Sequence, residues 1–518
     1  MAISASTVWE IRSDATAGNV NGGGFVTGAS GTDFSQQAAA QYNLTGCTSA
    51  AADAIILNAS AAADMVGNLA HVISGTNATA GWYEILSVSV GVSITVDRNW
   101  GSAAVAAGVV NIGGALSLVS TLDDDFFEAP EAGNTIYIKN GTYVMGETVT
   151  TAKDGATQKP IVVEGYNSTR GDKPTGSTRP TLNWGATLFS SGDYWHFKYL
   201  INIGTGSNVI SCGLGNRFIH VKIKNTSSTA DRGALSLSGA ESFVSNCECV
   251  CYRGYGIDTS TSAGYNIIDS YIHDSNIGIK VDTVTQHMVI LNNILVSNIT
   301  SAIHITGAQT SSTLIKGNTL YGAENTIGIG VNIATGTLYP RIENNIIYGF
   351  ATGVNHADVQ TSGYDSYNAY NNNDTNATNW TLGTGSITTA PGFTSVSQLT
   401  GATATTSGSV LTQSGGDFST VVDGQDYLYL VSGTGITAGV YGITSHTGTT
   451  LTLDIAPGTN ATADKVWQIT TGRNFAIGAN YKAAGTPAAF AGGTTTGYTD
   501  IGAVQRQEPS AGGSFTFS

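Results

Sequence analysis

The sequence is poor in charge. Asp, Glu, Lys and Arg make up only 11% of its 518 residues, less than half of the roughly 25% that is usual in soluble domains. Acidic residues outnumber basic ones by 36 to 21, the formal net charge is -15, and no cluster of Lys and Arg occurs. Nucleic-acid binding depends on a basic surface, so we expect no nucleic-acid partner.

Long hydrophobic runs are missing as well. The most apolar stretch, near residues 55–72, is interrupted by Asn58, Asp64 and Asn68, so it falls short of the roughly 18 predominantly apolar residues of a membrane span. The first residues, Met1–Ile11, lack the basic and apolar segments of a signal peptide. We therefore expect no signal peptide, no transmembrane segment and no membrane partner, and a protein that is assembled in a cytoplasm.

Proline and cysteine are scarce, with 9 and 5 residues. The shortage of proline favours uninterrupted β-ladders. Cys247, Cys249 and Cys251 alternate, so they would share one face of a strand, and His273 falls beside Cys249 in the register that we expect. A zinc site is one interpretation; the other, which we favour, is that small residues fill strand positions in a reduced protein. Motifs for nucleotide, metal or nucleophile chemistry do not occur in their required context, so we expect no metal and no cofactor.

A repeat with steps of 22 to 27 residues runs through the middle third of the chain. Its alternating apolar phrases begin at Phe243, Ile267, Val289, Leu314 and Arg341. In each unit a small residue or an Asn pair separates two apolar alternations. A strand-like unit of this size can bury its apolar side only against its neighbours, and the repeat therefore indicates a solenoid.

A second repeat joins two distant segments. Residues 72–85 (VISGTNATAGWYEI) match residues 430–443 (LVSGTGITAGVYGI), and Ile94–Asp97 match Leu451–Asp454. Shared composition does not explain the match, because the Ser-Gly-Thr and Ala-Gly-x-Tyr-x-Ile spacings are identical. We predict two related β modules with short strands and Gly-rich hairpins, which interrupt the solenoid near its ends.

Two further segments resemble a known family. Residues 134–143 (NTIYIKNGTY) resemble the rung that opens many right-handed parallel β-helix proteins of the pectate-lyase-like superfamily, and residues 474–505 are similar to their closing segment. The resemblance implies an all-β fold, a right-handed parallel β-helix solenoid with two related small β modules inserted near its ends. The predicted boundaries are an N-terminal strand or cap segment at 1–45, the first module at 46–115, the parallel β-helix at 116–400, the second module at 401–473 and a closing segment at 474–518.

Equivalent positions of a parallel β-helix form columns, with about 4.8 Å between turns. Asn293, Asn318 and Asn345 share one column, and we interpret them as a structural amide ladder at a turn. Ligand binding by these amides is the alternative interpretation.

Asp258, Lys280 and His304 share another column, which should face outward because the Ile residues beside them point inward. An acid, an amine and an imidazole on adjacent turns are the candidates for acid–base catalysis. The alternative is a solvated surface pair between Asp258 and Lys280.

Other positions bear on sugar chemistry, which needs two carboxylates roughly 5 to 10 Å apart. In the expected register, Asp269 and Glu343 share an outward column but lie three turns, or about 14 Å, apart. Asp274 and Asp282 are expected on other sides of the coil. This arrangement predicts no hydrolase site within one chain.

An apolar column, Leu295, Leu320 and Ile347, is expected to face outward and therefore to be covered. It predicts an interface, for which a homotrimer is one solution and a folded-back C-terminal segment is another.

Residues 9–37, together with the inserted modules, resemble proteins encoded by tailed phages. We therefore predict a non-enzymatic structural protein of the virion, either a capsid decoration or cement protein or a head or tail fibre. Its partners would be other capsid or tail proteins, docked through the duplicated modules. The alternative is a receptor-binding tailspike or a polysaccharide-degrading hydrolase or lyase that acts on host surface glycans. A bacterial adhesin is a third interpretation, which the missing export signal disfavours.

Overall fold

The structure, a computed structural model, describes residues 8–12, 42–66, 69–113, 116–118, 124–151, 153–229, 231–259, 264–282, 287–306, 313–322, 328–334, 340–359, 364–393, 395–475, 487–489 and 495–498. The chain divides into two compact units, Met1–Gly204 with Ile210–Lys222, and Thr205–Val209 with Ile223–Ser518. Most of the predicted N-terminal segment and of the predicted closing segment, including residues 499–505, lies outside the described residues.

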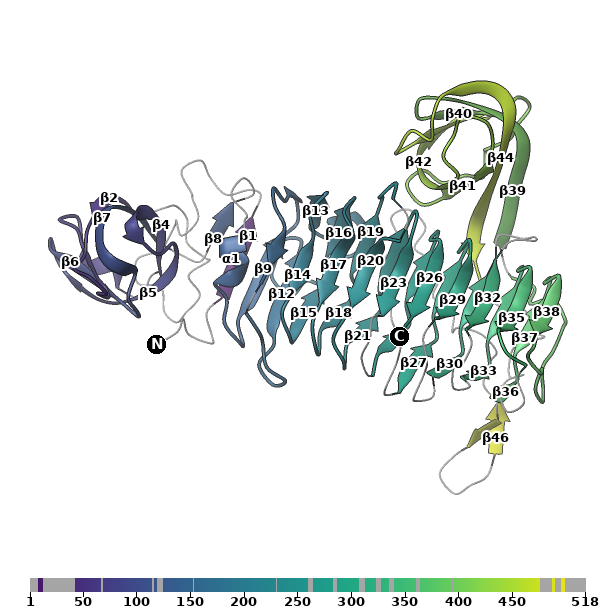
Figure 1. The fold of residues 1–518 in the computed structure, drawn as a ribbon, viewed down its shortest axis with the longest axis horizontal. Coiled ribbons are helices and arrows are strands. Elements are labelled where there is room, and N and C mark those ends of the chain that lie inside the picture. Colours follow the sequence, from purple (N-terminus) through teal and green to yellow (C-terminus); the bar gives the residue numbers. More distant parts are fainter. Residues whose placement is uncertain are drawn as a thin grey trace. The chain divides into compact units, whose positions relative to one another are not determined.

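The described residues are nearly all β and include a β-solenoid of about nine turns. Each turn adds one strand to each of three parallel sheets (Figure 1). This confirms the predicted fold, a right-handed parallel β-helix with two related small β modules. No helix among the described residues is both long and apolar enough to cross a lipid bilayer.

In the first unit, the solenoid strands pair in parallel from turn to turn. The first sheet contains, in order, β8 (Leu116–Leu118), β1 (Val8–Arg12), β9 (Thr135–Lys139), β12 (Ile161–Tyr166), β15 (Trp195–Lys198) and β18 (Arg217–Ile219). The second contains β10 (Thr142–Val144), β13 (Thr181–Gly185) and β16 (Ile201–Gly204), and the third β11 (Val149–Thr150), β14 (Phe189–Ser191) and β17 (Asn208–Cys212). A short helix, α1 (Asp124–Glu128), packs Phe126 against Trp9 and Phe127 against Phe189.

The second unit continues the same architecture. One sheet contains β21 (Phe243–Ser245), β24 (Asn266–Ile268), β27 (Met288–Leu291), β30 (Thr313–Lys316), β33 (Arg341–Glu343) and β36 (Tyr364–Ser366). Another contains β19 (Lys222–Asn225), β22 (Glu248–Cys251), β25 (Tyr271–His273), β28 (Ile294–Val296), β31 (Thr319–Tyr321), β34 (Ile346–Tyr348) and β37 (Ala369–Asn371). The third contains β20 (Gly233–Leu237), β23 (Tyr255–Thr259), β26 (Ile277–Val281), β29 (Ser301–Ile305), β32 (Ile329–Ile333), β35 (Thr352–His356) and β38 (Thr375–Thr378).

The apolar alternation that marks the repeat fills the solenoid interior. In the third sheet, β-branched residues stand opposite each other on successive turns and are completely buried: Ile257, Ile279, Ile303, Val331 and Val354. Because side chains of a strand alternate between its two faces, the residues next to these isoleucines and valines must point outward. The register of this sheet therefore decides which polar side chains gather on its outer face.

The two β modules share one strand topology. In the first unit the sheet order is β2 (Tyr42–Cys47), β7 (Gly101–Gly113), β4 (Leu69–Ala78), β5 (Gly81–Ser89), β6 (Ser93–Val96) and β3 (Ile55–Leu57). In the second unit a closed barrel contains the equivalent strands β39 (Ser395–Ser407), β44 (Asn460–Asn474), β41 (Tyr427–Ser432), β42 (Gly439–His446), β43 (Thr450–Leu453) and β40 (Val410–Thr412). Each module has its own apolar core, around Trp100 in the first and Trp467 in the second. The barrel connects to the solenoid of its unit through β39 and β44, which run antiparallel side by side (Figure 1). A hairpin of β45 (Pro487–Ala489) and β46 (Thr495–Tyr498) follows it in the sequence.

Candidate functional site

The catalytic candidates of the sequence meet on the outer face of the third sheet. Asp258 of β23 stands opposite Lys280 of β26, which in turn stands opposite His304 of β29. All three side chains are half-buried. The Nζ of Lys280 lies 3.3 Å from Oδ1 of Asp258. It also lies 4.8 Å from the centre of the Tyr255 ring.

The neighbourhood shifts the pKa values of two of these groups. Burial raises the pKa of Asp258, Lys280 lowers it in part, and Asp282 raises it further. Burial lowers the pKa of His304, and so does the charge of Lys280. His304 is therefore neutral at pH 7, and its Nδ1 is buried without a hydrogen-bond partner among the described residues. The arrangement combines a carboxyl group that holds its proton more tightly than usual with an ammonium group and a neutral imidazole.

A second carboxylate reaches the same lysine. Asp282 directly follows β26 of the third sheet, on another side of the coil from Asp269 and Glu343 as expected, but its contact with Lys280 was not predicted. Oδ2 of Asp282 is 3.9 Å from Nζ of Lys280. Since both carboxylates contact one nitrogen, their oxygens lie within about 7 Å of each other, a separation that sugar hydrolysis can use. The physical reason is that Asp282 follows Lys280 by two residues, so extended backbone returns it to the same face.

The predicted column of Asp269 and Glu343 is wrong. Glu343 is aligned with Lys316 in β30, and it pairs with Lys316 at 3.4 Å and with Arg341. Asp269 instead follows β24, at a turn position with a φ of 52°. The two residues therefore lie one register position apart, and Glu343 is neutralised by its own cationic neighbours.

The Asn residues form a continuous ladder at the turn between the first and second sheets. Nδ2 of Asn293 donates to Oδ1 of Asn318 at 3.0 Å, and Nδ2 of Asn318 donates to Oδ1 of Asn345 at 2.9 Å. Asn345 repeats the contact with Asn368, at 3.0 Å. Each of these amides is fully buried and also accepts a backbone N–H from the preceding turn's equivalent residue. The geometry leaves no ladder amide exposed to a ligand along this series.

The apolar column Leu295, Leu320 and Ile347 is not an interface, because all three side chains are completely buried and point into the solenoid. A methyl group added to Gly278 or Gly330 of the opposite sheet would meet Leu295 and Ile347 at 3.0 and 2.6 Å. The three residues do share one column, as expected, but the column was assigned to the outer face of its strands although it faces inward.

The outward neighbours in the same strands are the apolar residues that need a cover. Val296 and Tyr321 are buried under Phe475, and the Tyr321 ring stacks on Tyr348 at 5.1 Å. Phe393 packs against both tyrosines. The segments that enter and leave the barrel therefore cover this face of the second unit, and the reason for expecting a trimer interface there disappears.

A buried charge network joins the barrel to the solenoid. The two Nη atoms of Arg473, near the end of β44, donate to the carboxylate oxygens of Asp274 at 2.6 and 3.2 Å. Nε of Arg473 lies 3.6 Å from Oδ1 of Asp426. Nδ1 of His273 is 2.7 Å from Oδ2 of Asp274, and its Nε2 is 3.3 Å from Glu248.

The pKa directions show how this network divides its charge. Burial raises the pKa of Asp274, but Arg473 and His273 outweigh it, so the pKa is lowered overall. Burial lowers the pKa of His273, and Asp274 and Glu248 reverse the shift and raise it. Burial raises the pKa of Asp426, with Arg473 acting against it. The network holds the barrel in one orientation through charges that are costly to separate.

Sequence reasoning did not identify this network. Asp274 and Arg473 are 199 residues apart, and neither belongs to a recognisable motif. The one indication in the sequence is that Arg473 is the last residue of the predicted second module. Thr470, three residues earlier, also contacts the solenoid, since its Oγ1 lies 2.7 Å from Oγ of Ser297.

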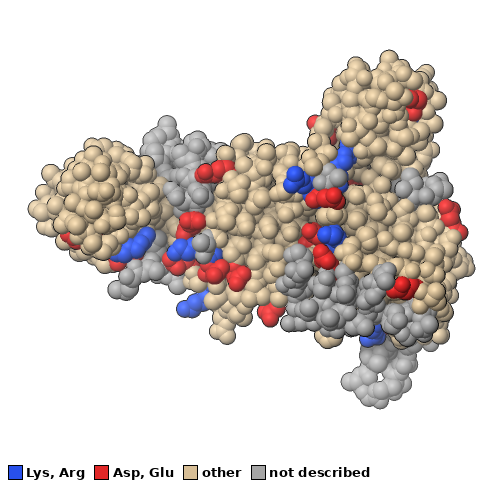
Figure 2. Space-filling view, in the orientation of Figure 1, with Lys and Arg blue, Asp and Glu red and all other residues tan. Residues whose placement is uncertain are grey.

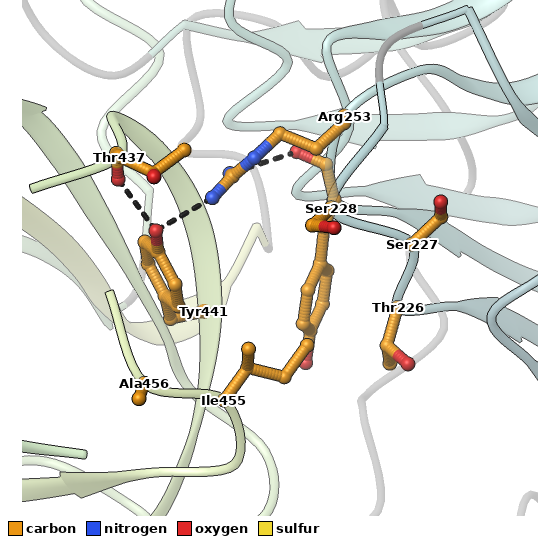
Figure 3. Close-up of a pocket in the computed structure, with 9 residues that line it drawn as sticks. Thr226, Ser227, Ser228, Arg253, Thr437, Tyr441, Ile455 and Ala456 are labelled. Atoms are coloured by element: carbon orange, nitrogen blue, oxygen red, sulfur yellow. Dashed lines mark hydrogen bonds between the residues drawn. The ribbon is translucent and has the colours of Figure 1, made fainter. Parts of the chain in front are cut away.

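A small pocket lies between the barrel and the solenoid of the second unit, with about 290 Å³ of space that includes solvent at its mouth. Figure 3 shows Arg253 reaching across it to Tyr441, whose hydroxyl donates to the carbonyl of Thr437. The rest of the lining consists of Thr226, Ser227, Ser228, Tyr252, Ile455 and Ala456. Its size admits water or a small ion rather than an oligosaccharide.

The cysteines do not converge on a metal site. His273 stands opposite Val250, and Ile272 stands opposite Cys249, so the expected pairing of His273 with Cys249 is wrong. Cys247, Cys249 and Cys251 are buried and not joined by disulfides. Burial raises the pKa of Cys251 to about 12. In the part of the chain that the structure describes, no group of three His, Cys, Asp or Glu side chains is arranged to hold a metal ion.

Charged side chains are sparse on the face shown in Figure 2, where small groups of red and blue are separated by wide uncharged areas. This agrees with the composition of the chain. Among the described residues on that face, charged side chains do not gather into one extended patch.

No protein-family model and no curated protein matches the chain. Among solved structures, it is similar to the pectate lyase Pel9A, with 13% identity and a TM-score of 0.36 over 76% of this chain and 92% of that chain. It is also similar to tailspike gp61 of Pseudomonas phage phi297, with 13% identity and a TM-score of 0.26 over 83% and 81% of the two chains. The Gp54 tailspike of Acinetobacter baumannii bacteriophage AP22, solved with a capsular saccharide, gives 10% identity and a TM-score of 0.23 over 83% of each chain. At these identities the likeness concerns the fold, and no activity follows from it.

Proposed function

We propose that the chain is a non-enzymatic structural protein of a tailed-phage particle. In this proposal the solenoid is a rigid scaffold, and the β modules contact other capsid or tail proteins. The phage assignment rests on the sequence resemblance of residues 9–37 and the inserted modules. The structural role rests on how the second module is attached.

That attachment is the observation that carries the proposal. Arg473 and Asp274 form a buried, two-pronged ion pair between the barrel and the solenoid. Apolar contacts of Phe475 with Tyr321 and Val296 add to it. A module that hung on a flexible linker would suit a tethered binding domain, whereas a module held by buried charges keeps a fixed orientation. Fixed orientation is what a component of a regular particle requires.

The proposal is tested on particles released by cells that carry the gene. Peptides of the chain should be found in gradient-purified particles in several copies per particle. Particles made without it should remain infectious but lose infectivity faster on heating. If purified particles contain none of the chain, the proposal is rejected.

A receptor-binding or polysaccharide-degrading role is the second candidate, and one observation favours it. Asp258 and Asp282 lie within the separation that two carboxylates need to act on a sugar, and the pKa of Asp258 is raised, as a general acid requires. Lys280 opposes this role, because it forms ion pairs with both carboxylates.

The second candidate is tested by incubating the purified protein with host capsule or lipopolysaccharide and measuring new reducing ends or unsaturated ends. Release that disappears in both Asp258→Asn and Asp282→Asn, but persists in Asp417→Asn, would establish the enzymatic role and overturn the structural one. Asp417 is a suitable control because it is an exposed carboxylate of the barrel whose hydrogen bond goes to the backbone of Ser419. No release with any of these proteins would remove the enzymatic candidate for that glycan.

A further inference from the structure

The two β modules contain the same small site, built from a tyrosine, an aspartate and a backbone carbonyl. The sequence match pairs Tyr83 with Tyr441 and Asp97 with Asp454. In the first module, the Tyr83 hydroxyl donates to the carbonyl of Thr79 at 2.9 Å, and Tyr441 donates to the equivalent Thr437. Both tyrosines are 1% exposed. The rings are therefore held in one orientation in each copy.

The aspartates are oriented in the same way. Oδ1 of Asp97 accepts the N–H of Glu84 at 3.1 Å, and Oδ1 of Asp454 accepts the N–H of Gly442 at 3.0 Å. In both modules the second oxygen, Oδ2, is turned toward a cation. Each site thus offers a π surface, the tyrosine ring, and two acceptors. The acceptors are Oδ2 of the aspartate and the carbonyl of the residue before the tyrosine, Trp82 or Val440. These are the groups that a guanidinium binds.

In the first module an arginine of the module itself fills the site. The Cζ of Arg98 lies 4.1 Å from the centre of the Tyr83 ring. Its Nη1 is 2.8 Å from Oδ2 of Asp97, and its Nη2 donates to the carbonyl of Trp82. The site is thus closed by the residue that directly follows its aspartate.

In the second module that residue is Ile455, and an arginine of the solenoid takes its place. The Cζ of Arg253 lies 4.8 Å from the centre of the Tyr441 ring. Its Nη1 donates to the carbonyl of Val440 at 3.3 Å, and its Nη2 donates to the Tyr441 hydroxyl at 2.6 Å, as Figure 3 shows. The ring contact and the carbonyl contact are those that Arg98 makes in the first module.

Two further features of the second module bear on its external arginine, of which the glycine is shared with the first module as Gly81. Oδ2 of Asp454, which has no following arginine, pairs with Lys224 at 3.1 Å and accepts the Tyr252 hydroxyl. Gly439 has a φ of 138°, and a Cβ at this position would lie 1.4 Å from Nη1 of Arg253. Only glycine leaves room for the guanidinium there.

We propose that the duplicated module is an arginine-binding module. Its site takes a guanidinium group from one of two sources: the module's own residue that directly follows the aspartate, or an arginine of the surface on which the module docks. The residue after the aspartate decides between the two. Arginine there, as Arg98, closes the site from within. An apolar residue there, as Ile455, leaves the site to an arginine of the docking surface.

The first test opens the site of the first module. Arg98→Ala in the full chain should lower the melting temperature of that module by roughly 5 °C. Ethylguanidinium at millimolar concentration should restore it, while ethylammonium at the same ionic strength should not, because an ammonium group cannot stack and fork as a guanidinium does. The unaltered protein should respond to neither compound. Equal responses to both compounds, or no response in the variant, would overturn the proposal.

The second test supplies an internal arginine to the second module and does not depend on Arg98. Arg253→Ala should lower the melting temperature of the barrel, and adding Ile455→Arg should recover it. Ile455→Arg alone should bring no gain, since two arginines then compete for one site, and Ile455→Met serves as the uncharged control in both backgrounds. Because the predicted signature is this non-additivity, an effect of Ile455→Arg that is equal in the two backgrounds would contradict the proposal. Far-ultraviolet circular dichroism checks that each variant is folded.

Discussion

Arg473 donates two hydrogen bonds to Asp274, at 2.6 and 3.2 Å, and both side chains are about 95% buried. The pair connects the last strand of the barrel to a turn of the solenoid. An ion pair this deeply buried is expensive to break from one side, because the remaining charge loses its partner in a place that water does not reach.

Arg473→Ala should therefore destabilise the barrel and its attachment by about 3–5 kcal/mol. The double variant Arg473→Met with Asp274→Leu should lose less, because neither charge of this pair is left without the other. Urea unfolding followed by tyrosine fluorescence measures both. A double variant as unstable as the single one would mean that the shape of the pair, not its charge, matters.

Replacing an amide in the middle of the Asn ladder should lower the stability of the protein. Asn318→Ala removes the acceptor of the Asn293 side chain and backbone and the donor to Asn345, and should cost roughly 2–4 kcal/mol for the groups left unsatisfied. Asn332→Ala is the matched control, since Asn332 lies on the outer face and accepts one bond from Asn355. We expect that control to change the free energy of unfolding by no more than about 1 kcal/mol. Similar losses for both variants would contradict a structural ladder.

The inward direction of Leu320 makes a prediction about its substitution. Leu320→Ala should cost about 2–5 kcal/mol, as expected for a cavity in a packed interior, and should leave the oligomeric state unchanged. Val359→Ala, at a side chain that is 75% exposed, should cost no more than about 0.5 kcal/mol. Urea unfolding and sedimentation measure the two effects. Dissociation of an oligomer by Leu320→Ala without loss of stability would restore the interface interpretation.

His196 in β15 should make the first unit sensitive to acid. Burial, together with Arg217 and Lys198, lowers the pKa of His196 from 6.5 to about 4. Between these values the unfolded chain takes up a proton that the folded chain does not, so stability is retained above pH 6.5 and falls as the pH drops toward 4. His196→Gln should lose less stability over this interval than the unaltered protein. An imidazole that titrates near pH 6.5 in the folded protein, measured by NMR, would contradict this.

The repeat was sufficient to predict the solenoid, and the identical spacing in residues 72–85 and 430–443 was sufficient to predict the duplicated module. Both signals depend on local alternation, which a strand imposes directly. The column Asp258, Lys280 and His304 was also placed correctly. The Ile residue beside each of them shows which face of the strand points inward, so the polar residue must point outward.

The predictions for other positions were wrong where the local sequence pattern is ambiguous. In β28, β31 and β34 three consecutive residues are apolar or nearly so, and alternation alone does not say which faces inward, so Leu295, Leu320 and Ile347 were assigned to the wrong side. Asp282 was missed because the extended backbone continues past the last Ile of its strand. Arg473, Asp274 and Asp426 come together only through the docking of the barrel, which no local pattern encodes.

The barrel also changes how the solenoid can come apart. Its strands and stem contact Lys224, Tyr252, Asp274, Ser297 and Tyr321, which lie on successive turns, a stretch of roughly 20 Å along the solenoid axis. A bare solenoid can fray one turn at a time, since each turn contacts only its neighbours. Under the barrel, no turn of this stretch can open without releasing contacts that also hold the others. The module therefore couples the opening of these turns to one another. We expect this part of the second unit to unfold as one cooperative unit when it is exposed to proteases or to a pulling force.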